Sequence, residues 1–271
     1  VIPPGTELIF PEILDLEVNS ASFGASSTTN YAIFGEVEYR PLPKLGLILG
    51  ARLDHERTRT RADDTVDINI DLPPELFSDP NQGPVNLSAS FSAFLPKAGI
   101  VYDWTDDLST SFVVQRGYRA GGAQINAFTG QVNEFDPEFT WNFELAARSS
   151  WFDGRLSANA NAYLLLWRDQ QVNVSGASGS SLDVISSNAG RARLYGGVIS
   201  LTALPLDGLS LFASVGVAET KFLDFVQGDD DFSGNSFPRA PAFSASFGGS
   251  YYFDNGFEVH GDVSYTAASF S

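Results

Sequence analysis

Long runs of alternating polarity constrain the fold of this chain more than any other feature. Between residues 155 and 164, every second residue is apolar and the residues between them are mostly polar. Because side chains alternate between the two faces of a β-strand, such a run predicts a strand with one apolar and one polar face. Similar runs recur along the chain and are about 12 to 17 residues long, whereas ordinary globular strands average about 5 to 6 residues. Their length argues against a soluble β-sandwich.

The turns between these runs fall into two classes. Asp153-Gly154 is the strongest hairpin signal, because a type I′ turn needs positive φ at both central positions. Short turns are predicted near residues 43, 106, 154, 206 and 255, and long polar loops over roughly 58–88, 121–137, 172–186 and 224–238. The two classes alternate strictly, so each lies at one end of an antiparallel meander of about ten strands. Outer-membrane barrels show this asymmetry.

The two faces of the expected strands differ in charge. One face carries charged side chains that a packed core could not hold unpaired, among them Glu36, Arg52, Glu144 and Asp262. The opposite face is apolar and includes Leu47, Leu145, Leu211 and Val259. An apolar face against lipid and a charged face toward a wet lumen satisfy both sets of side chains. Aromatic girdles are predicted from residues near strand ends, namely Tyr39, Trp104, Trp141, Trp151, Tyr163, Trp167 and Tyr252.

Two stretches give a weaker pattern. Residues 1–28 are rich in Pro, Ser and Glu, and we read them as a loop, with a short strand near residues 13–18 as the alternative. The strand expected over 187–203 contains Gly196-Gly197, which interrupts the alternation, and a β-bulge there would account for it.

Composition excludes several classes of function. The net charge of −17 argues against a nucleic-acid partner, for which a basic patch is the expected footprint. There is no cysteine, and the two histidines, His55 and His260, lie far apart in sequence. No metal site, cofactor or nucleophilic centre is therefore expected, and the chain does not read as an enzyme. No apolar run is long enough for a membrane-spanning helix, but strands of alternating polarity give a much weaker signal per segment.

An ordered set of short motifs carries a resemblance to a known family. The segment 116–122, Arg-Gly-Tyr-Arg-Ala-Gly-Gly, is followed by Asp136-Pro137-Glu138, Asn142-Phe143-Glu144-Leu145, Asp153-Gly154-Arg155-Leu156, Asp169-Gln170-Gln171-Val172 and Asn188-Ala189-Gly190-Arg191-Ala192. In this order the motifs resemble those of TonB-dependent outer-membrane receptors. The resemblance runs from about residue 31 to the end of the chain.

The resemblance implies an all-β fold, an incomplete antiparallel transmembrane β-barrel with about ten strands of a barrel of 22. Residues 1–271 would form part of that barrel, without the plug domain that fills it in the family. The implied function is TonB-energised uptake across the bacterial outer membrane of a scarce ligand such as a ferric siderophore, cobalamin or an oligosaccharide. Implied partners are outer-membrane lipid, the TonB complex acting through the missing plug, and a small-molecule ligand such as an iron chelate. Alternatives are a passive porin-like barrel and a soluble glycan-binding β-protein.

Ten strands of so large a barrel span too little arc to close on themselves. We therefore expect an open, curved sheet with edges at the strands near residues 30–40 and 257–270. The charged face should be concave and the apolar face convex.

Ligand candidates lie within the segment 116–122 and shortly after it. Arg119, Gln124 and Asn126 are the residues proposed for binding, with Arg119 offering forked donors to an anionic or metal-chelate ligand. Arg119 could equally pair with an acidic residue on a neighbouring strand. Gly121 and Gly122 are read as positions where the chain leaves its strand with positive φ. Two acidic groups, residues 63–71 and 229–231, could bind calcium, but a solvated acidic loop is the simpler interpretation.

Overall fold

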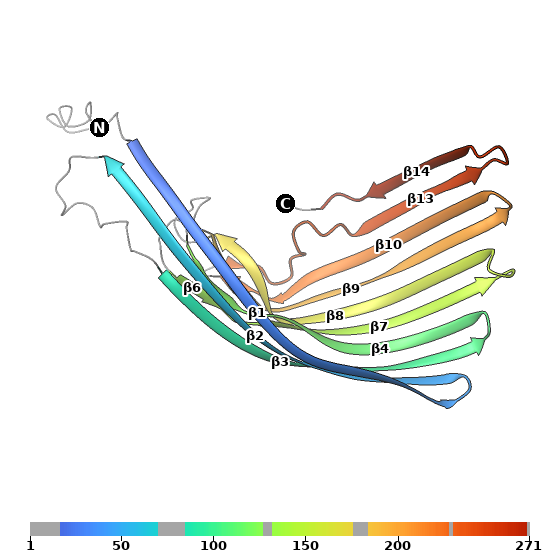
Figure 1. The fold of residues 1–271 in the computed structure, drawn as a ribbon, viewed down its shortest axis with the longest axis horizontal. Coiled ribbons are helices and arrows are strands. Elements are labelled where there is room, and N and C mark those ends of the chain that lie inside the picture. The colour runs from blue at the N-terminus through green and yellow to red at the C-terminus, as the bar shows by residue number, and fades with distance from the viewer. Residues whose placement is uncertain (1–16, 70–84, 127–131, 176–183, 228–229, 270–271) are drawn as a thin grey trace.

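The computed structural model describes residues 17–69, 85–126, 132–175, 184–227 and 230–269. Ten strands of this part form one antiparallel sheet (Figure 1), in the order β1 (Glu17–Leu42), β2 (Leu45–Asn69), β3 (Val85–Thr105), β4 (Leu108–Arg119), β7 (Glu138–Trp151), β8 (Leu156–Ser175), β9 (Val184–Leu206), β10 (Leu209–Asp224), β13 (Phe243–Tyr252) and β14 (Glu258–Thr266). Two small hairpins stand apart from it, β5 (Gly122–Ile125) with β6 (Val132–Phe135) and β11 (Val226–Gln227) with β12 (Asp230–Asp231). The expected meander of ten strands is confirmed.

The sheet is open and strongly curved. Its edges are β1 and β14, which do not pair with each other in the described residues, and Figure 1 shows them at opposite margins of a bent sheet. The expected open wall of a larger barrel is confirmed. No helix of the described residues is long and apolar enough to cross a membrane.

The strands are longer at the loop end than the sequence predicts. The segment read as a loop up to residue 28 belongs to β1 from Glu17 onward, and its backbone pairs with β2 as far as Asn69. The loops expected over 58–88 and 172–186 are likewise shortened by the ends of β2, β3, β8 and β9. Outside the membrane both faces of a strand can meet water, so the period-two pattern disappears although the backbone ladder continues. The expectation of a strand at residues 13–16 lies outside the described residues.

The short turns lie where they were expected. Pro43-Lys44 connects β1 to β2, and residues 152–155 connect β7 to β8. In the latter turn Phe152, Asp153 and Gly154 all have positive φ, of 56°, 54° and 84°. The Asp-Gly signal is therefore confirmed, within a four-residue loop rather than the two-residue type I′ turn.

The strand register aligns polar with polar and apolar with apolar residues across the sheet. One row of directly paired positions, from β3 to β14, consists of Asp103, Ser109, Arg148, Asn159, Ser200, Ser214, Ser246 and Ser264. The adjacent row on the other face consists of Tyr102, Thr110, Ala147, Ala160, Ile199, Val215, Ala245 and Tyr265. A slip of one residue at any strand would exchange its two faces, so the pattern fixes the register.

The polar face is the concave one. Thr60 of β2 and Asn173 of β8 line the same cavity, although β3, β4 and β7 separate their strands in the sheet. Residues of such distant strands can approach each other only inside the curve. The register places Glu36, Arg52, Glu144 and Asp262 on this face, and Leu47, Leu145, Leu211 and Val259 on the convex face, as the sequence predicts. Convex side chains are well exposed, for example Leu49 at 66% and Leu145 at 55%.

The aromatic girdle is confirmed in part. Tyr39, Trp104 and Trp151 lie on the convex face beside the short turns, and Trp141 lies on it toward the loop end. Tyr163, Trp167 and Tyr252 instead occupy concave positions, so their assignment to a girdle was wrong. Side chains alternate between the two faces along a strand, so whether a residue points outward depends on its position in that alternation. Its nearness to the end of the strand does not give this information.

The bulge expected at Gly196-Gly197 is absent. The ladders of β9 with β8 and β10 continue through both glycines without a shift. A Cβ atom on Gly196 would lie 2.2 Å from the carbonyl oxygen of Val217 and 2.7 Å from the hydroxyl of Tyr163. Glycine is required here because a neighbouring backbone and a lumenal tyrosine approach the strand closely, and not because the ladder is irregular.

We expect Gly196→Ala to destabilise the folded barrel by about 1–3 kcal/mol, the usual cost of overpacking against groups that cannot move freely. Gly261→Ala is the matched control, since nothing lies within 4 Å of a Cβ at that position of β14. Denaturant unfolding of the full-length protein in lipid vesicles measures both variants. Equal stability of the two would contradict the close approach at Gly196.

Candidate ligand-binding site

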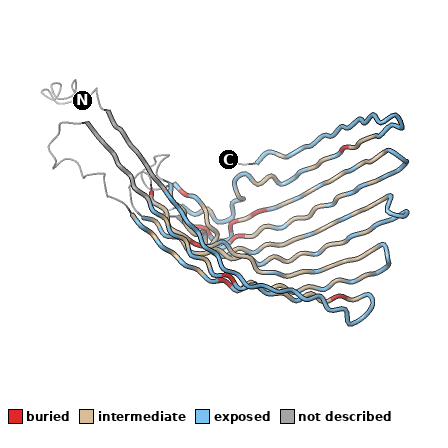
Figure 2. Tube along the Cα trace, in the orientation of Figure 1, coloured by how far each residue is buried: buried red, intermediate tan, exposed pale blue. Residues whose placement is uncertain are grey.

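A cluster of buried apolar side chains lies at the loop end of the sheet. Val174, Ala192, Phe222 and Phe225 form a buried cluster, against which further apolar side chains pack, namely Trp167, Val172, Ile185, Phe232 and Phe237. Figure 2 shows how few buried positions lie elsewhere along the sheet. A wall that faces lipid on one side and a lumen on the other has no core of its own. The cluster therefore forms where a loop folds back onto the wall.

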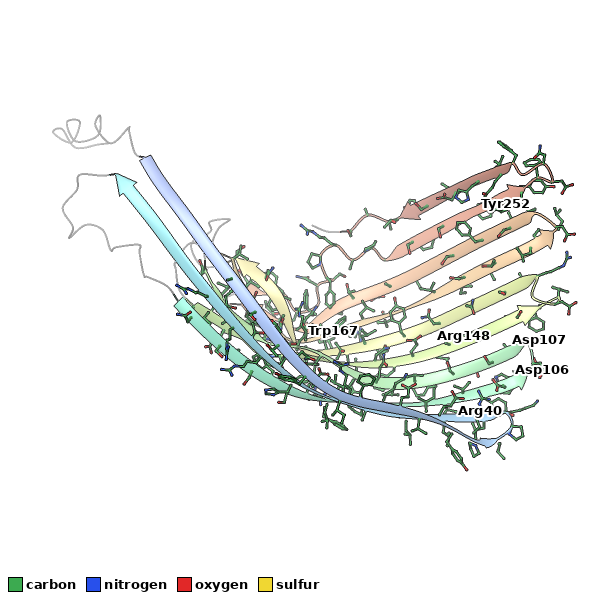
Figure 3. The ribbon with its side chains drawn as sticks, in the orientation of Figure 1. Arg40, Asp106, Asp107, Arg148, Trp167 and Tyr252 are labelled. Atoms are coloured by element: carbon green, nitrogen blue, oxygen red, sulfur yellow. The ribbon has the colours of Figure 1, made fainter. Side chains whose placement is uncertain are left out.

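That loop is the segment between β10 and β13. The ring of Phe237 meets Trp167, labelled in Figure 3, with centroids 5.9 Å apart, and Phe222 with centroids 4.6 Å apart. The backbone nitrogen of Phe222 donates to the carbonyl of Asn235 at 2.9 Å. Residues 224–238, expected to be a long polar loop, thus contain the β11–β12 hairpin and an aromatic anchor. The phenylalanines in this polar segment were the signal that could have indicated the anchor.

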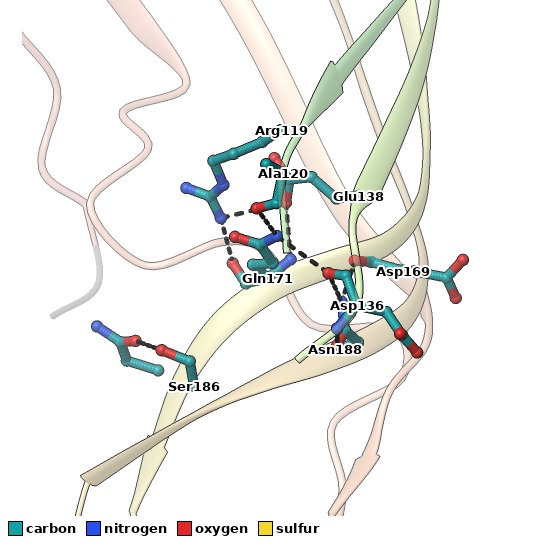
Figure 4. A network of polar contacts seen from close by, with 9 residues as sticks. Arg119, Ala120, Asp136, Glu138, Asp169, Gln171, Ser186 and Asn188 are labelled. Carbon is teal, nitrogen blue, oxygen red and sulfur yellow. Dashed lines mark hydrogen bonds and ion pairs between the residues drawn. The ribbon is translucent and has the colours of Figure 1, made fainter. Parts of the chain in front are cut away.

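A second hairpin, β5–β6, also lies over the concave face. It contacts β2 and β3 on one side and β9 on the other. Amide side chains hold its base (Figure 4): Gln171 Nε2 donates to the carbonyls of Ala120 and Asp136 at 2.9 and 3.0 Å. Asn188 Nδ2 donates to the carbonyl of Asp136 at 2.9 Å, and the backbone nitrogen of Asp136 donates to Asn188 Oδ1 at 2.8 Å. The polar loop expected over 121–137 is therefore a fixed hairpin.

Motifs far apart in the sequence meet in this network. Asp136, Glu138, Gln171 and Asn188 come from three of the short motifs that carried the family resemblance, and all of them join the base of β5–β6 to β8 and β9. Their shared structural role is to fix the position of the hairpin. Sequence order alone could not show that these residues are neighbours.

Arg119 pairs with an acidic residue on a neighbouring strand, Glu138, as the alternative to a purely ligand-binding role had proposed. Its Nη2 donates to Glu138 Oε2 at 3.2 Å and to the carbonyl of Gln171 at 3.2 Å. The same Glu138 oxygen accepts from the backbone nitrogen of Gln171 at 2.7 Å. The Arg119 side chain nevertheless stays 58% exposed, while that of Glu138 is 13% exposed. Arg119 can therefore still present donors to a ligand on the lumenal side.

Gln124 and Asn126 lie within the hairpin region. Gln124 Nε2 donates to the carbonyl of Val184 at 3.3 Å, and its Oε1 accepts from the hydroxyl of Ser186 at 2.9 Å. Asn126 is buried, with 4% of its surface exposed. The hydrogen bonds of Gln124 attach the hairpin to β9, and neither residue is among those that line the cavity beside Arg119. Their role in ligand binding remains a prediction.

The role first assigned to Gly121 and Gly122 is wrong. Neither residue has positive φ. A Cβ on Gly121 would lie 2.4 Å from the carbonyl oxygen of Phe135, and one on Gly122 would lie 2.9 Å from the ring of Phe135. The two glycines let β5 approach the end of β6 closely, so they fix the hairpin and not a turn.

A cavity of about 420 Å³ lies between this hairpin and the outer parts of β1, β2, β8 and β9. Its polar side chains provide one cation, four hydroxyls and two amides, which belong to Arg119, Ser26, Thr58, Thr60, Ser186, Gln171 and Asn173. Such a lining offers hydrogen-bond donors and acceptors from several strands to one polar molecule. It fits a ligand rich in oxygen atoms better than an apolar one.

A neighbouring polar cluster on β1 and β2 was not indicated by the sequence. Asp54 is 5% exposed and accepts from Asn30 Nδ2 at 2.9 Å and from Arg52 Nη2 at 2.9 Å. These residues line a second cavity, of about 500 Å³, together with Arg119 and Tyr118. Arg119 thus stands between two polar cavities of the concave face.

The proposed calcium groups gain no support. Asp71 and Asp229 lie outside the described residues, as do the side chains of the other acidic residues of the first group. Across the described residues, no three acidic or histidine side chains are grouped so as to hold a metal ion. Asp231 accepts from the backbone nitrogen of Ser233 at 2.9 Å, and hydrogen bonds from the hydroxyl and backbone of Ser233 lower the pKa of the Asp231 carboxyl. This carboxylate has a local structural partner in the external hairpin.

These observations define the class of protein. The chain is a section of an outer-membrane β-barrel wall, with a lipid-facing apolar surface, short turns at one end and inward-folded hairpins at the other. The model of the family described as TonB dependent receptor-like, beta-barrel, matches residues 6–270. The chain belongs to this family of bacterial outer-membrane receptors, which is not a class of enzymes.

Known receptors resemble this chain in structure and in sequence. The ferric yersiniabactin uptake receptor FyuA of Yersinia pestis superposes with a TM-score of 0.66 at 17% identity, over 90% of this chain and 39% of that chain. The ferric-catecholate import receptor Fiu of E. coli K12 gives a TM-score of 0.67 at 16% identity, over 90% of this chain and 35% of that chain. In sequence, the ferric-pyoverdine M114 receptor PbuA of Pseudomonas sp. (strain M114) is 26% identical over 143 residues, which is 50% of this chain and 16% of that receptor. The chain thus spans well under half the length of these relatives.

One of the alternatives can now be judged. A soluble sandwich or propeller is wrong, because the described strands form a single open sheet whose apolar face is uncovered. The predicted family, fold and outer-membrane location are confirmed.

Proposed function

We propose that this chain is the ligand-binding section of a receptor barrel that takes up a ferric siderophore in a TonB-dependent manner. The observation that carries the proposal is the polar cavity beside Arg119, under a hairpin fixed to the concave face. A ferric chelate presents many oxygen atoms around its metal, and the hydroxyls, amides and guanidinium of this cavity are suited to them. The names of PbuA, FyuA and Fiu, receptors for ferric pyoverdine, ferric yersiniabactin and ferric catecholates, support the same class of ligand.

Transport requires parts beyond the described wall. We propose that a plug domain fills the concave side in the full-length protein and transmits the pull of TonB. The charged groups at the short-turn end, including the ion pairs of Arg40 with Asp103 at 2.7 Å and Lys97 with Glu36 at 2.7 Å, are suited to a polar partner inside the barrel. Cobalamin and oligosaccharides remain alternative cargoes of the same kind of barrel.

Deleting residues 123–134 from the full-length receptor is expected to weaken ligand binding at least about tenfold. The reason is that the β5–β6 hairpin forms one wall of the cavity and helps to position the polar side chains beside it. Binding of ferric pyoverdine, ferric yersiniabactin and a ferric catecholate to the full-length receptor in detergent, followed by tryptophan fluorescence, measures the effect. Barrel insertion, followed by heat-modifiable gel mobility, is expected to stay intact. Unchanged binding by the deletion variant would contradict a site under this hairpin.

The passive porin remains the alternative to active uptake. Uptake of the labelled ferric chelate should saturate and should stop in cells that lack TonB. Uptake that rises linearly with concentration and continues without TonB would favour the passive barrel.

A further inference from the structure

The two polar cavities of the concave face adjoin each other along β2. Lumenal side chains of this strand line both of them in succession: Arg52, Asp54 and Glu56 line the cavity of about 500 Å³, and Thr58 and Thr60 line the cavity of about 420 Å³. We call these the Asp54 cavity and the Thr60 cavity. Arg119 and Ala120 of the neighbouring wall line both. Residues two apart on a strand lie about 7 Å apart, so Glu56 lies at the junction of the two cavities.

The charged groups of the Asp54 cavity are not all balanced. Arg52 donates to Asp54 from both Nε and Nη2, and Arg119 donates to Glu138. Glu56 is half-buried, and it forms no ion pair or hydrogen bond with any side chain in the described part of the chain. Its carboxylate is therefore the charge of this cavity that no described cation neutralises.

A metal ion is a poor partner for this carboxylate. The Asp54 side chain is 2% exposed, and its oxygen atoms accept from Arg52 and Asn30, so it cannot join Glu56 in holding a metal. Over the described ranges, no group of three acidic or histidine side chains could hold a metal ion. The single free carboxylate fits a ligand that brings its own donors.

A ligand that occupies the junction would displace water from Glu56. If the ligand were neutral or anionic there, the carboxylate would lose its hydration and gain no partner, which is costly. An ammonium or guanidinium group on the ligand would instead donate charge-assisted hydrogen bonds to it. A site with such an unpaired group discriminates against ligands that lack the matching one.

We propose that Glu56 selects ferric chelates that carry an ammonium or guanidinium group in addition to their chelating oxygen atoms. The role of Glu56 rests on the proposed function, the uptake of a ferric siderophore. The chelate occupies the Thr60 cavity beside Arg119, whose exposed guanidinium faces the oxygen atoms. The cationic group of the same ligand reaches across the junction to Glu56 in the Asp54 cavity.

The test uses the full-length receptor in detergent and four synthetic chelates. A ferric hydroxamate and a ferric catecholate are each prepared with one free primary amine and with that amine acetylated. The unaltered receptor is expected to bind the amine form about tenfold more tightly than the acetylated form, since a hydrogen bond to a charged group usually contributes this much. Tryptophan fluorescence measures the Kd of each chelate.

Glu56→Gln keeps the size of the side chain and removes its charge. This variant is expected to bind the amine form about tenfold more weakly, while the acetylated form binds as it does to the unaltered receptor. Glu219→Gln is the matched control, because it removes the same charge at a similar height on the convex face. Glu219 is ten residues beyond Leu209 of β10, and Glu56 is eleven residues beyond Leu45 of β2. The control should keep the preference for the amine form.

Three results would overturn the role of Glu56 alone. They are equal binding of the two forms by the unaltered receptor, a preference that persists in Glu56→Gln, and an equal loss of preference in Glu219→Gln. Binding of none of the four chelates would overturn the proposed function, and the role of Glu56 with it. Heat-modifiable gel mobility verifies that each variant is folded. The comparison of the two forms on the unaltered receptor needs no variant, so it decides the question even if Glu56→Gln fails to fold.

Discussion

Replacing Val215 by arginine is expected to destabilise the barrel by about 2–4 kcal/mol, because the residue faces lipid close to the bilayer midplane. Val215 lies six residues into β10 from its short turn, on the convex face, and is 45% exposed. The buried charge would lose its hydration without gaining a partner. Denaturant unfolding of the full-length protein in lipid vesicles measures the loss.

Two control variants distinguish the effect of the sheet face on which the arginine lies from the effect of its depth in the membrane. Leu211→Arg lies on the same face of β10 but only two residues from the turn, so its cost is expected to be about 0–1 kcal/mol. Ser246→Arg lies near mid-height on the concave face of β13 and should cost little, because the lumen is polar. A cost at Ser246 equal to that at Val215 would show that the two faces are assigned wrongly.

Replacing Phe222 by alanine is expected to remove about 3–5 kcal/mol from the packing of the loop-end cluster. Phe222 is 6% exposed and contacts Phe225 and Phe237 with ring centroids 5.0 and 4.6 Å apart. Because the cluster holds only one loop, the loss should appear as local opening and not as unfolding of the sheet. Hydrogen exchange should therefore accelerate over residues 225–237 while the amides of β8 and β9 stay protected.

Val226→Ala provides the matched control within the same hairpin. This side chain is 62% exposed and should change exchange little. Faster exchange throughout β8, β9 and β10 in the Phe222 variant would instead mean that the cluster stabilises the whole wall. Unchanged exchange in residues 225–237 would mean that the loop is held by its backbone hydrogen bonds alone.

The site was predictable only in part. Arg119 was identified from its place within a recognisable motif, and it does line a polar cavity. Its pairing with Glu138 was an open alternative, because the partner lies across a hairpin whose path the sequence does not reveal. The roles of Gln171 and Asn188 in holding that hairpin were not foreseen, since amide side chains that bond to distant carbonyls leave no periodic signal.

The sequence by itself determined the architecture of the wall. Long runs of alternating polarity and two classes of turn specify ten antiparallel strands, their order and the apolar and polar faces of their periodic parts, because these follow from local periodicity and short connections. Only the tertiary structure decided how the loop ends fold inward and why Gly121 and Gly196 are glycines. These features depend on contacts between residues far apart in the chain, and the curvature of the sheet brings such residues together.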